Sequence, residues 1–218
     1  MLHAVSTKFN AGVTLLGDTQ DLLGLHECIT YFASESGPLP AFHDEFLFSF
    51  AYDVRHAYQG DRRSEPIGRP EKGGRYWAFD TLWPTALVYA GMMRAAAAFV
   101  PTTKFHQAML YQLEFCLERA LDGVDAKISR DCMEWMRNFT ALPENYLINF
   151  VFEQANRYVF ENTSARRRIS SLPSVLRDIS PMSERYRRYA ENLERIAIER
   201  KCSPHDLHDF TEWSEIKW

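Results

Sequence analysis

An apolar run in the middle of the chain constrains the fold more than any other feature. Residues 86–100 read ALVYAGMMRAAAAFV, and Arg94 is the single charged side chain among them. A membrane-spanning helix needs about 20 consecutive apolar residues, so this run is too short to cross a bilayer. The sequence therefore predicts a buried helix here and no membrane partner.

Apolar residues also recur at helical spacing on both sides of this run. One stripe consists of Leu22, Leu25, Ile29 and Phe32, and a second consists of Phe46, Phe50, Val54 and Ala57. Asp18 or Thr19 is suited to cap the first helix, and Gly60 is suited to end the second. Further helices are predicted at about 84–99, 103–122, 126–139, 143–161 and 182–201.

Strand signals lie in the N-terminal half. Two β-capable runs flank Asn10-Ala11-Gly12, and we expect Gly12 to supply the positive φ of a tight hairpin turn. Residues 75–83, RYWAFDTLW, are strand-like, whereas residues 64–74 predict a loop. The expected fold class is α+β and helix-dominant: an N-terminal β-hairpin, extended by a 75–80 strand into a small sheet, packed on a multi-helix body.

The charge is spread unevenly along the chain. The net charge is −4, yet residues 163–201 carry 10 basic and 5 acidic side chains, and residues 202–218 carry 1 basic and 4 acidic ones. We therefore divide the chain into a main α+β domain, residues 1–162, and a second piece, residues 163–218. The second piece is predicted to be a basic, serine-rich connector followed by helices that pack on the main domain.

The cysteines indicate the compartment. Cys28, Cys116, Cys132 and Cys202 are too far apart in sequence to clip a metal, and three of them lie in apolar helical patterns. The N-terminal residues MLHAVSTKF show no signal-peptide pattern. These features predict a reduced, cytoplasmic protein without a cofactor.

Most of the basic side chains of the second piece fall in two short runs. They are Arg166, Arg167 and Arg168 in ARRRISS, and Arg185, Arg187 and Arg188, with Tyr186, in SERYRRY. Arginines with interleaved aromatics suit an anionic partner, either nucleic acid or an acidic protein. The same residues also suit a solvated helix with Glu184–Arg188 and Glu191–Arg195 ion pairs. Trp213 and Trp218 near the C-terminus either fold back on the body or anchor a partner.

The stretch ERKCSPHDLHDFTEW, residues 199–213, allows three interpretations. His205, His208 and Asp209 would share one face of a helix and hold a metal ion. Ser203 and Pro204 would instead simply begin a helix. The spacing of Ala197, Lys201 and Leu207 also resembles a helix-turn-helix, but the acidic residues of its second helix would repel phosphates, and lysine replaces the glycine expected at the turn.

A further polar pair lies in YDVRHAYQGDRR, where Asp53 and His56 are three residues apart. An Asp–His pair can act as a general base if a nucleophile is close. A helix with its polar edge in water accounts for the same pattern. The pair is the most plausible polar site in the N-terminal half.

Two passages carry a resemblance. With AYDVRHAYQGDR, residues 51–62, and YWAFDTLWPTALVYAGMMR, residues 76–94, the chain resembles a bacterial family known only as a domain of unknown function. The resemblance covers about residues 1–160 and implies no activity, cofactor or catalytic residues. By analogy, small bacterial proteins of this kind often belong to mobile-element or phage-defence operons.

The sequence contains no nucleophile elbow, phosphate-binding glycine loop or HExxH motif. We therefore predict a non-enzymatic protein that binds another protein subunit, as part or regulator of a bacterial phage-defence or toxin-control system. Two alternatives stay open. One is nucleic-acid binding by the basic 166–188 segment, and the other is a metal-dependent hydrolase that uses Asp53 and His56 or the C-terminal histidines.

Overall fold

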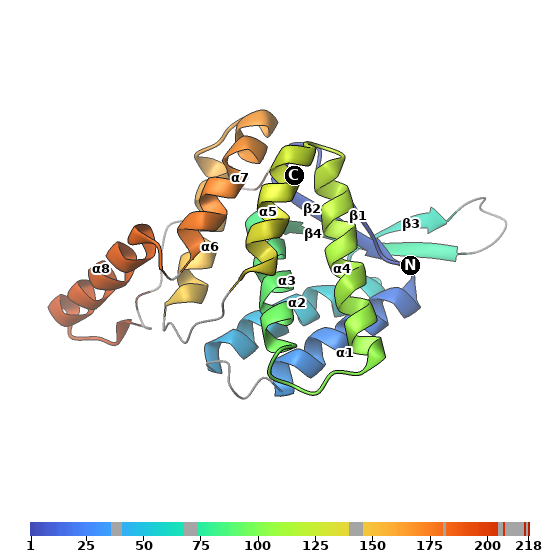
Figure 1. The fold of residues 1–218 in the computed structure, drawn as a ribbon, viewed down its shortest axis with the longest axis horizontal. Coiled ribbons are helices and arrows are strands. Elements are labelled where there is room, and N and C mark those ends of the chain that lie inside the picture. Colours follow the sequence, from blue (N-terminus) through green and yellow to red (C-terminus); the bar gives the residue numbers. More distant parts are fainter. Residues whose placement is uncertain are drawn as a thin grey trace.

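The computed structural model describes residues 1–35, 41–67, 74–139, 146–180, 182–204, 207, 216 and 218, with backbone only at 41–44, 65–67 and 74. Across these residues a four-stranded antiparallel sheet packs against a body of eight helices (Figure 1). This confirms the predicted fold class, α+β and helix-dominant, with the sheet at the N-terminal end of the chain.

The sheet has the strand order β1-β2-β4-β3. The strands are β1 His3–Ser6, β2 Gly12–Gly17, β3 Arg63–Ile67 and β4 Gly74–Leu82. The hairpin and the 75–80 strand are therefore confirmed. Strand β3 is a correction, because its residues were predicted to be loop. Pro66 suggested that loop, but at an edge strand a proline removes only an N–H that faces away from the ladder.

The turn between β1 and β2 corrects a second expectation. Asn10 has the positive φ, +51°, and Gly12 does not. Asn tolerates the left-handed region better than most residues. Gly12 is required for a different reason: a Cβ built there would lie 2.0 Å from the carbonyl oxygen of Thr81. The glycine therefore permits β2 to approach β4 closely.

The helices follow the predicted periodicity, with α1 capped as expected by Asp18, whose carboxylate accepts from the Asp21 N–H at 2.9 Å. Their bounds are α1 Thr19–Glu35, α2 Ala41–Tyr58, α3 Trp83–Ala96, α4 Lys104–Asp122, α5 Ala126–Arg137, α6 Leu147–Phe160, α7 Ala165–Ile179 and α8 Glu184–Arg200.

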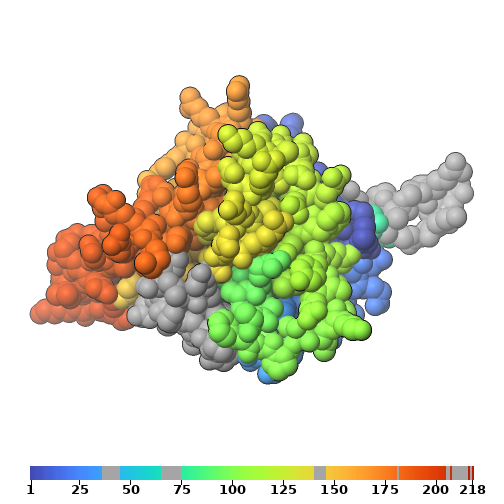
Figure 2. Space-filling model, in the orientation of Figure 1, coloured from blue at the N-terminus to red at the C-terminus, as the bar shows by residue number. Residues whose placement is uncertain are grey.

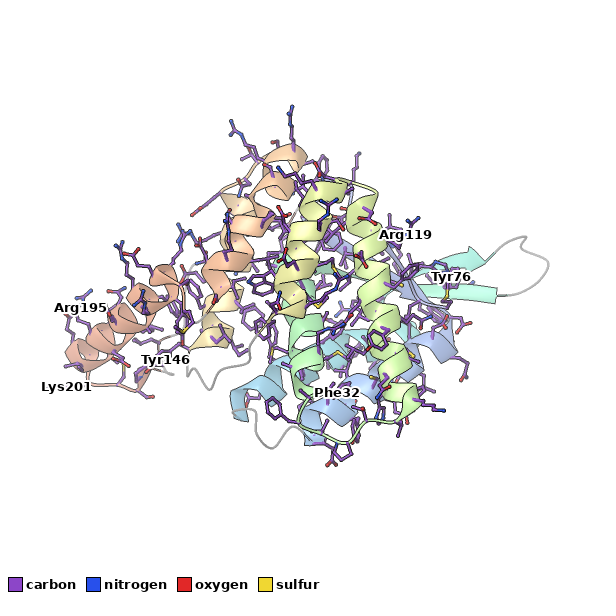
Figure 3. All side chains as sticks on the ribbon, viewed as in Figure 1. Phe32, Tyr76, Arg119, Tyr146, Arg195 and Lys201 are labelled. Carbon is purple, nitrogen blue, oxygen red and sulfur yellow. The ribbon has the colours of Figure 1, made fainter. Side chains whose placement is uncertain are left out.

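Helix α3 is the predicted buried helix. Twelve of its residues are buried, and it touches α4, α5, α6, α7 and strands β2 and β4. Side chains fill the space among these elements (Figure 3). The charged exception, Arg94, donates to both carboxylate oxygens of the buried Glu114 on α4. In the described part of the chain, no helix is long and apolar enough to span a membrane.

Helix α7 replaces the predicted basic connector. Ser164 caps its N-terminus by accepting from the Arg167 N–H at 3.3 Å. The connector interpretation was wrong because serines and a proline concealed an apolar stripe that packs on α5 and α6. That stripe is Ile169, Leu172, Leu176 and Ile179. It belongs to the same apolar core as β2 and α1, so the core extends across the boundary proposed at residue 162.

The first turn of α7 is joined to the β1–β2 turn by Arg168. Its guanidinium is buried and donates to the carbonyls of Asn162 at 2.9 Å, Val159 at 3.1 Å and Phe9 at 3.3 Å. The Tyr158 hydroxyl donates to the carbonyl of the adjacent Asn10 at 2.7 Å. These contacts correct the prediction for Arg168, because a buried guanidinium that binds three internal carbonyls is not part of a partner-binding surface.

We expect Arg168→Met to lower the free energy of unfolding by about 3 kcal/mol, because three buried carbonyls lose a charged donor. Urea denaturation measures the change. Arg167→Met is the matched control, since Arg167 is exposed on the same turn, and its effect should stay within about 0.5 kcal/mol. Equal effects of the two substitutions would show that the buried contacts contribute nothing specific.

We also expect Gly12→Ala to destabilise the protein by about 3 kcal/mol or more, because the new Cβ cannot occupy the space held by the Thr81 carbonyl. At Gly123 a Cβ would meet its nearest atom at 3.5 Å, an ordinary contact. Gly123→Ala should therefore leave stability unchanged or raise it by about 0.5 kcal/mol. Thermal melting of both variants checks this, and a mild effect at Gly12 would contradict the close approach of β2 and β4.

Candidate functional site

A groove lies between α6 and α8. Helix α8 forms one end of the molecule (Figures 1 and 2). Its volume is about 1050 Å³. The walls combine arginines, amides and apolar side chains. They are Asn149, Phe150, Phe152, Glu153, Gln154, Asn156 and Arg157 from α6, Arg185, Arg188, Tyr189, Asn192, Leu193, Ile196 and Arg200 from α8, and Leu207.

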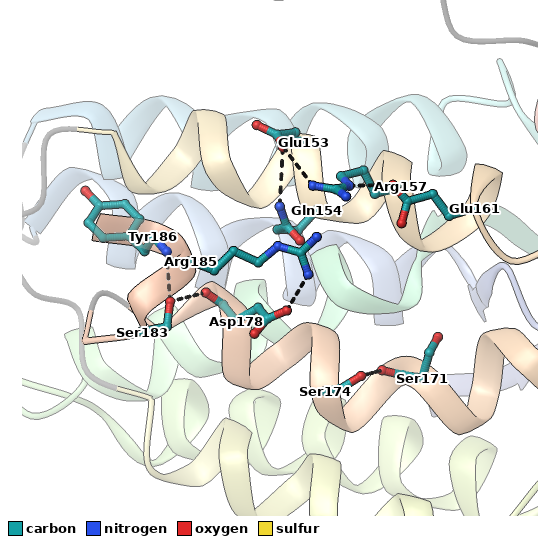
Figure 4. A network of polar contacts seen from close by, with 10 residues as sticks. All are labelled: Glu153, Gln154, Arg157, Glu161, Ser171, Ser174, Asp178, Ser183, Arg185 and Tyr186. Atoms are coloured by element: carbon teal, nitrogen blue, oxygen red, sulfur yellow. Dashed lines mark hydrogen bonds and ion pairs between the residues drawn. The ribbon is translucent and has the colours of Figure 1, made fainter. Parts of the chain in front are cut away.

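The start of α8 is fixed to the end of α7 by polar contacts (Figure 4). Ser183 caps α8 by accepting from the Tyr186 N–H at 3.0 Å, and its hydroxyl donates to the Asp178 carbonyl at 2.6 Å. Arg185 donates to the Asp178 carboxylate at 2.7 Å. These contacts fix the angle at which α8 leaves the body and therefore the width of the groove.

Tyr186 attaches α8 to α6. Its ring is 2% exposed and packs edge-on against Phe150 of α6, with ring centroids 5.6 Å apart. Its hydroxyl accepts from the Tyr146 N–H at 3.4 Å. The prediction that Tyr186 binds a partner is therefore corrected: the residue holds one wall of the groove, and the neighbouring Tyr189 lines it.

Ion pairs surround the groove. Arg157 lies 2.7 Å from Glu161 and 3.6 Å from Glu153, and both pairs link residues on α6 (Figure 4). The predicted Glu184–Arg188 pair is confirmed. The predicted Glu191–Arg195 pair is not formed.

Arg195 instead contacts Glu199 at 2.8 Å and Asn192 at 2.6 Å. Arg200, at the end of α8, forms no ion pair with any residue that the structure describes. Arg195 and Lys201, labelled in Figure 3, lie toward the outer end of this helix.

Gln154 occupies the floor of the groove. The residue is 2% exposed, and its Nε2 atom lies 3.5 Å from Glu153 Oε1, the longest hydrogen bond of this region. Within the described residues, no donor reaches its Oε1 atom. A buried acceptor without a donor costs about 1–3 kcal/mol, so the floor presents a polar group that a ligand can satisfy.

The predicted arginines thus separate in space. Arg185 and Arg188 line the groove, whereas Arg166, Arg167 and Arg187 are exposed outside its walls. Sequence reasoning missed Arg157, Arg200 and Gln154 as groove residues. The signal for Gln154 was present, because a glutamine four residues after Phe150 and four before Tyr158 interrupts an apolar stripe of α6.

Asp53 and His56 do not form a dyad. His56 Nδ1 lies 2.7 Å from Asp61 Oδ2, and Arg62 donates to Asp53 Oδ1 at 2.8 Å. Burial raises the pKa of the Asp53 carboxyl above its usual value, and the charges of Arg62 and His56 oppose this shift. Each residue is thus held by a partner from the turn after α2.

The C-terminal candidates lie mostly outside the described residues: His205, His208, Asp209 and Trp213 are among these. In the part of the chain that is described, no group of three metal-ligating side chains occurs. The turn residue Lys201 has a left-handed backbone, φ +53°, the conformation for which a helix-turn-helix normally uses glycine. Trp218 is 36% exposed and lines a cavity of about 400 Å³ on the sheet.

We expect one thiol per native chain to react with a chromogenic disulfide reagent at about pH 8. Burial raises the pKa of Cys28 and Cys132 to about 12 and that of Cys116 to about 11, whereas Cys202 is half-exposed after α8. Denaturant should expose all four thiols, and Cys202→Ser should abolish the native reaction. Rapid reaction of a second thiol would show that the core around α3 opens.

The comparisons with known proteins bear on the family alone. No curated protein and no solved structure matches the chain. A family model, the domain of unknown function DUF6904, matches residues 2–218. The match extends beyond residue 160, where the resemblance had ended, so α7, α8 and the groove lie inside the family's domain. The chain belongs to the DUF6904 family.

Proposed function

We propose that this protein works by binding a partner protein in the groove between α6 and α8. The observation that carries the proposal is the composition of an open groove of about 1050 Å³, in which arginines and aromatic rings stand side by side. Arginine and aromatic residues are enriched at the centres of protein interfaces, where they supply most of the binding energy.

Exposed apolar side chains support this proposal. Phe152 lines the groove and is 44% exposed, and Ile196 of α8, which also lines it, is half-buried. Burying such side chains against a partner contributes about 25 cal/mol for each Å² of apolar surface removed from water. A partner protein offers matching apolar side chains, whereas a phosphate backbone does not.

The charges of the groove also favour a protein partner. The lining arginines, Arg157, Arg185, Arg188 and Arg200, lie among aromatic, aliphatic and amide side chains. Non-specific binding of nucleic acid draws on cations that replace the counterions of phosphates. A groove that combines charged and apolar side chains is better suited to a protein surface, which offers charged and apolar groups, than to nucleic acid.

Nucleic-acid binding remains a second candidate because of a different set of side chains. Arg166, Arg167 and Arg187 are exposed and form no ion pair with a described residue. The affinity of nucleic acid for these arginines should fall steeply as the salt concentration rises. The affinity of a protein bound in the groove should depend less on salt, because apolar side chains contribute to it. A hydrolase is less well supported, because Asp53 and His56 are each held by another residue.

The cellular setting that we propose is the cytoplasm of a bacterium, with the protein as a subunit or regulator in a phage-defence or toxin-control system. Three buried, unpaired cysteines support a reducing compartment. The defence setting rests on analogy with other small bacterial protein families.

Site-specific photo-crosslinking tests the groove in the native host. We expect a photoreactive phenylalanine at Phe152 to give one defined crosslinked protein that survives nuclease treatment, identified by mass spectrometry. The matched control is Phe115 of α4, which is 52% exposed and lies outside the groove. The same crosslinks from both positions, or none from Phe152, would contradict the proposal. Products that disappear with nuclease would favour the second candidate.

A further inference from the structure

The walls and floor of the groove indicate the chemical class of its ligand. We infer that the α6–α8 groove binds an extended, acidic peptide segment of the partner protein. In this arrangement arginines contact the carboxylates of the peptide, and Gln154 contacts its main chain. The inference deepens the proposed function and rests on it.

The charge of the lining residues is the first argument. Among the residues that the structure describes, four arginines line the groove, Arg157, Arg185, Arg188 and Arg200, against one carboxylate, Glu153. The other acids that pair with these arginines, Glu161, Asp178 and Glu184, are not lining residues. The described part of the lining therefore carries an excess of positive charge, which attracts carboxylates and repels basic segments.

The existing ion pairs do not block this role. The Arg185–Asp178 and Arg188–Glu184 pairs are both solvent-exposed, and such pairs contribute about 0–1 kcal/mol. A guanidinium has five N–H donors, so it can keep its internal carboxylate while it binds one from a ligand. Arg200 has no ion pair within the described residues, so no described carboxylate competes with a ligand for it.

Gln154 supplies the second, independent argument. Its buried amide presents an acceptor, Oε1, that no described donor reaches, and a donor, Nε2, in a weak contact at 3.5 Å. A peptide unit offers the complementary pair, an N–H that donates to Oε1 and a carbonyl that accepts from Nε2. A phosphodiester has no N–H and would leave Oε1 without a donor. The floor of the groove therefore favours a polypeptide main chain.

The dimensions agree with a short segment. The lining residues of α8 extend from Arg185 to Arg200, a rise of about 22 Å at 1.5 Å per residue. An extended chain covers this distance with about six or seven residues, at 3.3–3.6 Å each. A segment of this length reaches Arg185 near one end of α8 and Arg200 at the other.

Selection from a random peptide library tests the inference. The full chain is immobilised, 12-residue peptides are selected, and labelled peptides are measured by fluorescence anisotropy at about 0.15 M salt. We expect the selected peptides to be enriched in Asp and Glu. Arg200→Glu and Arg188→Glu should each weaken their binding about tenfold or more.

Two further variants distinguish binding in the groove from non-specific attraction of acidic peptides to a basic surface. Arg195→Glu makes the same change on the same helix, outside the lining, and should change the dissociation constant by less than about threefold. Gln154→Leu should weaken binding about tenfold, provided that its thermal melt shows a folded chain. If that variant does not fold, N-methylation of each peptide bond in turn tests the same contact on the unmodified protein, since one methyl group should remove binding.

Three results would overturn the inference. They are selection of neutral or basic peptides, failure to select any peptide, and equal losses from the substitutions at Arg200 and Arg195. Crosslinking at Phe152 tests the proposed function, binding of a partner protein, independently of the acidic peptide. A specific crosslinked protein, together with any of these results, would leave the groove as a protein-binding site and refute only the acidic peptide.

Discussion

Helix α3 has no polar face, and this property decides how the other elements are arranged. Because nearly every side chain of α3 is apolar and buried, each side of the helix must be covered by another element. Strands β2 and β4 cover one side, and helices α4 to α7 cover others. The one cation, Arg94, is tolerated because Glu114 meets it from α4 with both carboxylate oxygens. The sheet and the C-terminal helices therefore share one core.

A second constraint joins the N-terminal hairpin to α6 and α7. Tyr158 and Arg168 donate to backbone carbonyls of the β1–β2 turn. The side-chain amide of Asn10 donates to the Ala165 carbonyl at 3.3 Å. The orientation of α6 and α7 thus depends on a turn near the N-terminus. Helix α8 is attached differently, through Ser183 at its start and a few buried residues such as Tyr186. The groove thus has one wall, α6, in the core, and a second wall, α8, held by its capped start and by the buried Tyr186, Leu193 and Ala197.

Sequence patterns predicted the helices and strands whose signals lie within the element itself. The apolar spacing of α1, α2 and α3, the Asp18 cap and the strand-like 75–83 stretch needed no knowledge of distant residues. Helix α7 was missed because Pro173 and the serines outweighed its apolar stripe, and β3 because Pro66 is tolerated only at an edge that sequence does not show. The burial of Arg168 was unpredictable for a stronger reason, since one of its acceptors, the Phe9 carbonyl, lies 159 residues away in sequence.

The fold gives different roles to arginines that are neighbours in sequence. Neighbours in ARRRISS divide between exposed positions and a buried structural contact, while the groove draws Arg157 from α6 and Arg200 from the far end of α8. Charge that is clustered in sequence is therefore only partly the charge that a ligand meets, since Arg185 and Arg188 line the groove and Arg187 does not. The groove is formed by α6 and α8 together, so a free peptide spanning residues 166–188 lacks Gln154, Arg157 and Arg200. The position of the α6 wall in turn depends on the packing around α3, because α6 packs against that helix.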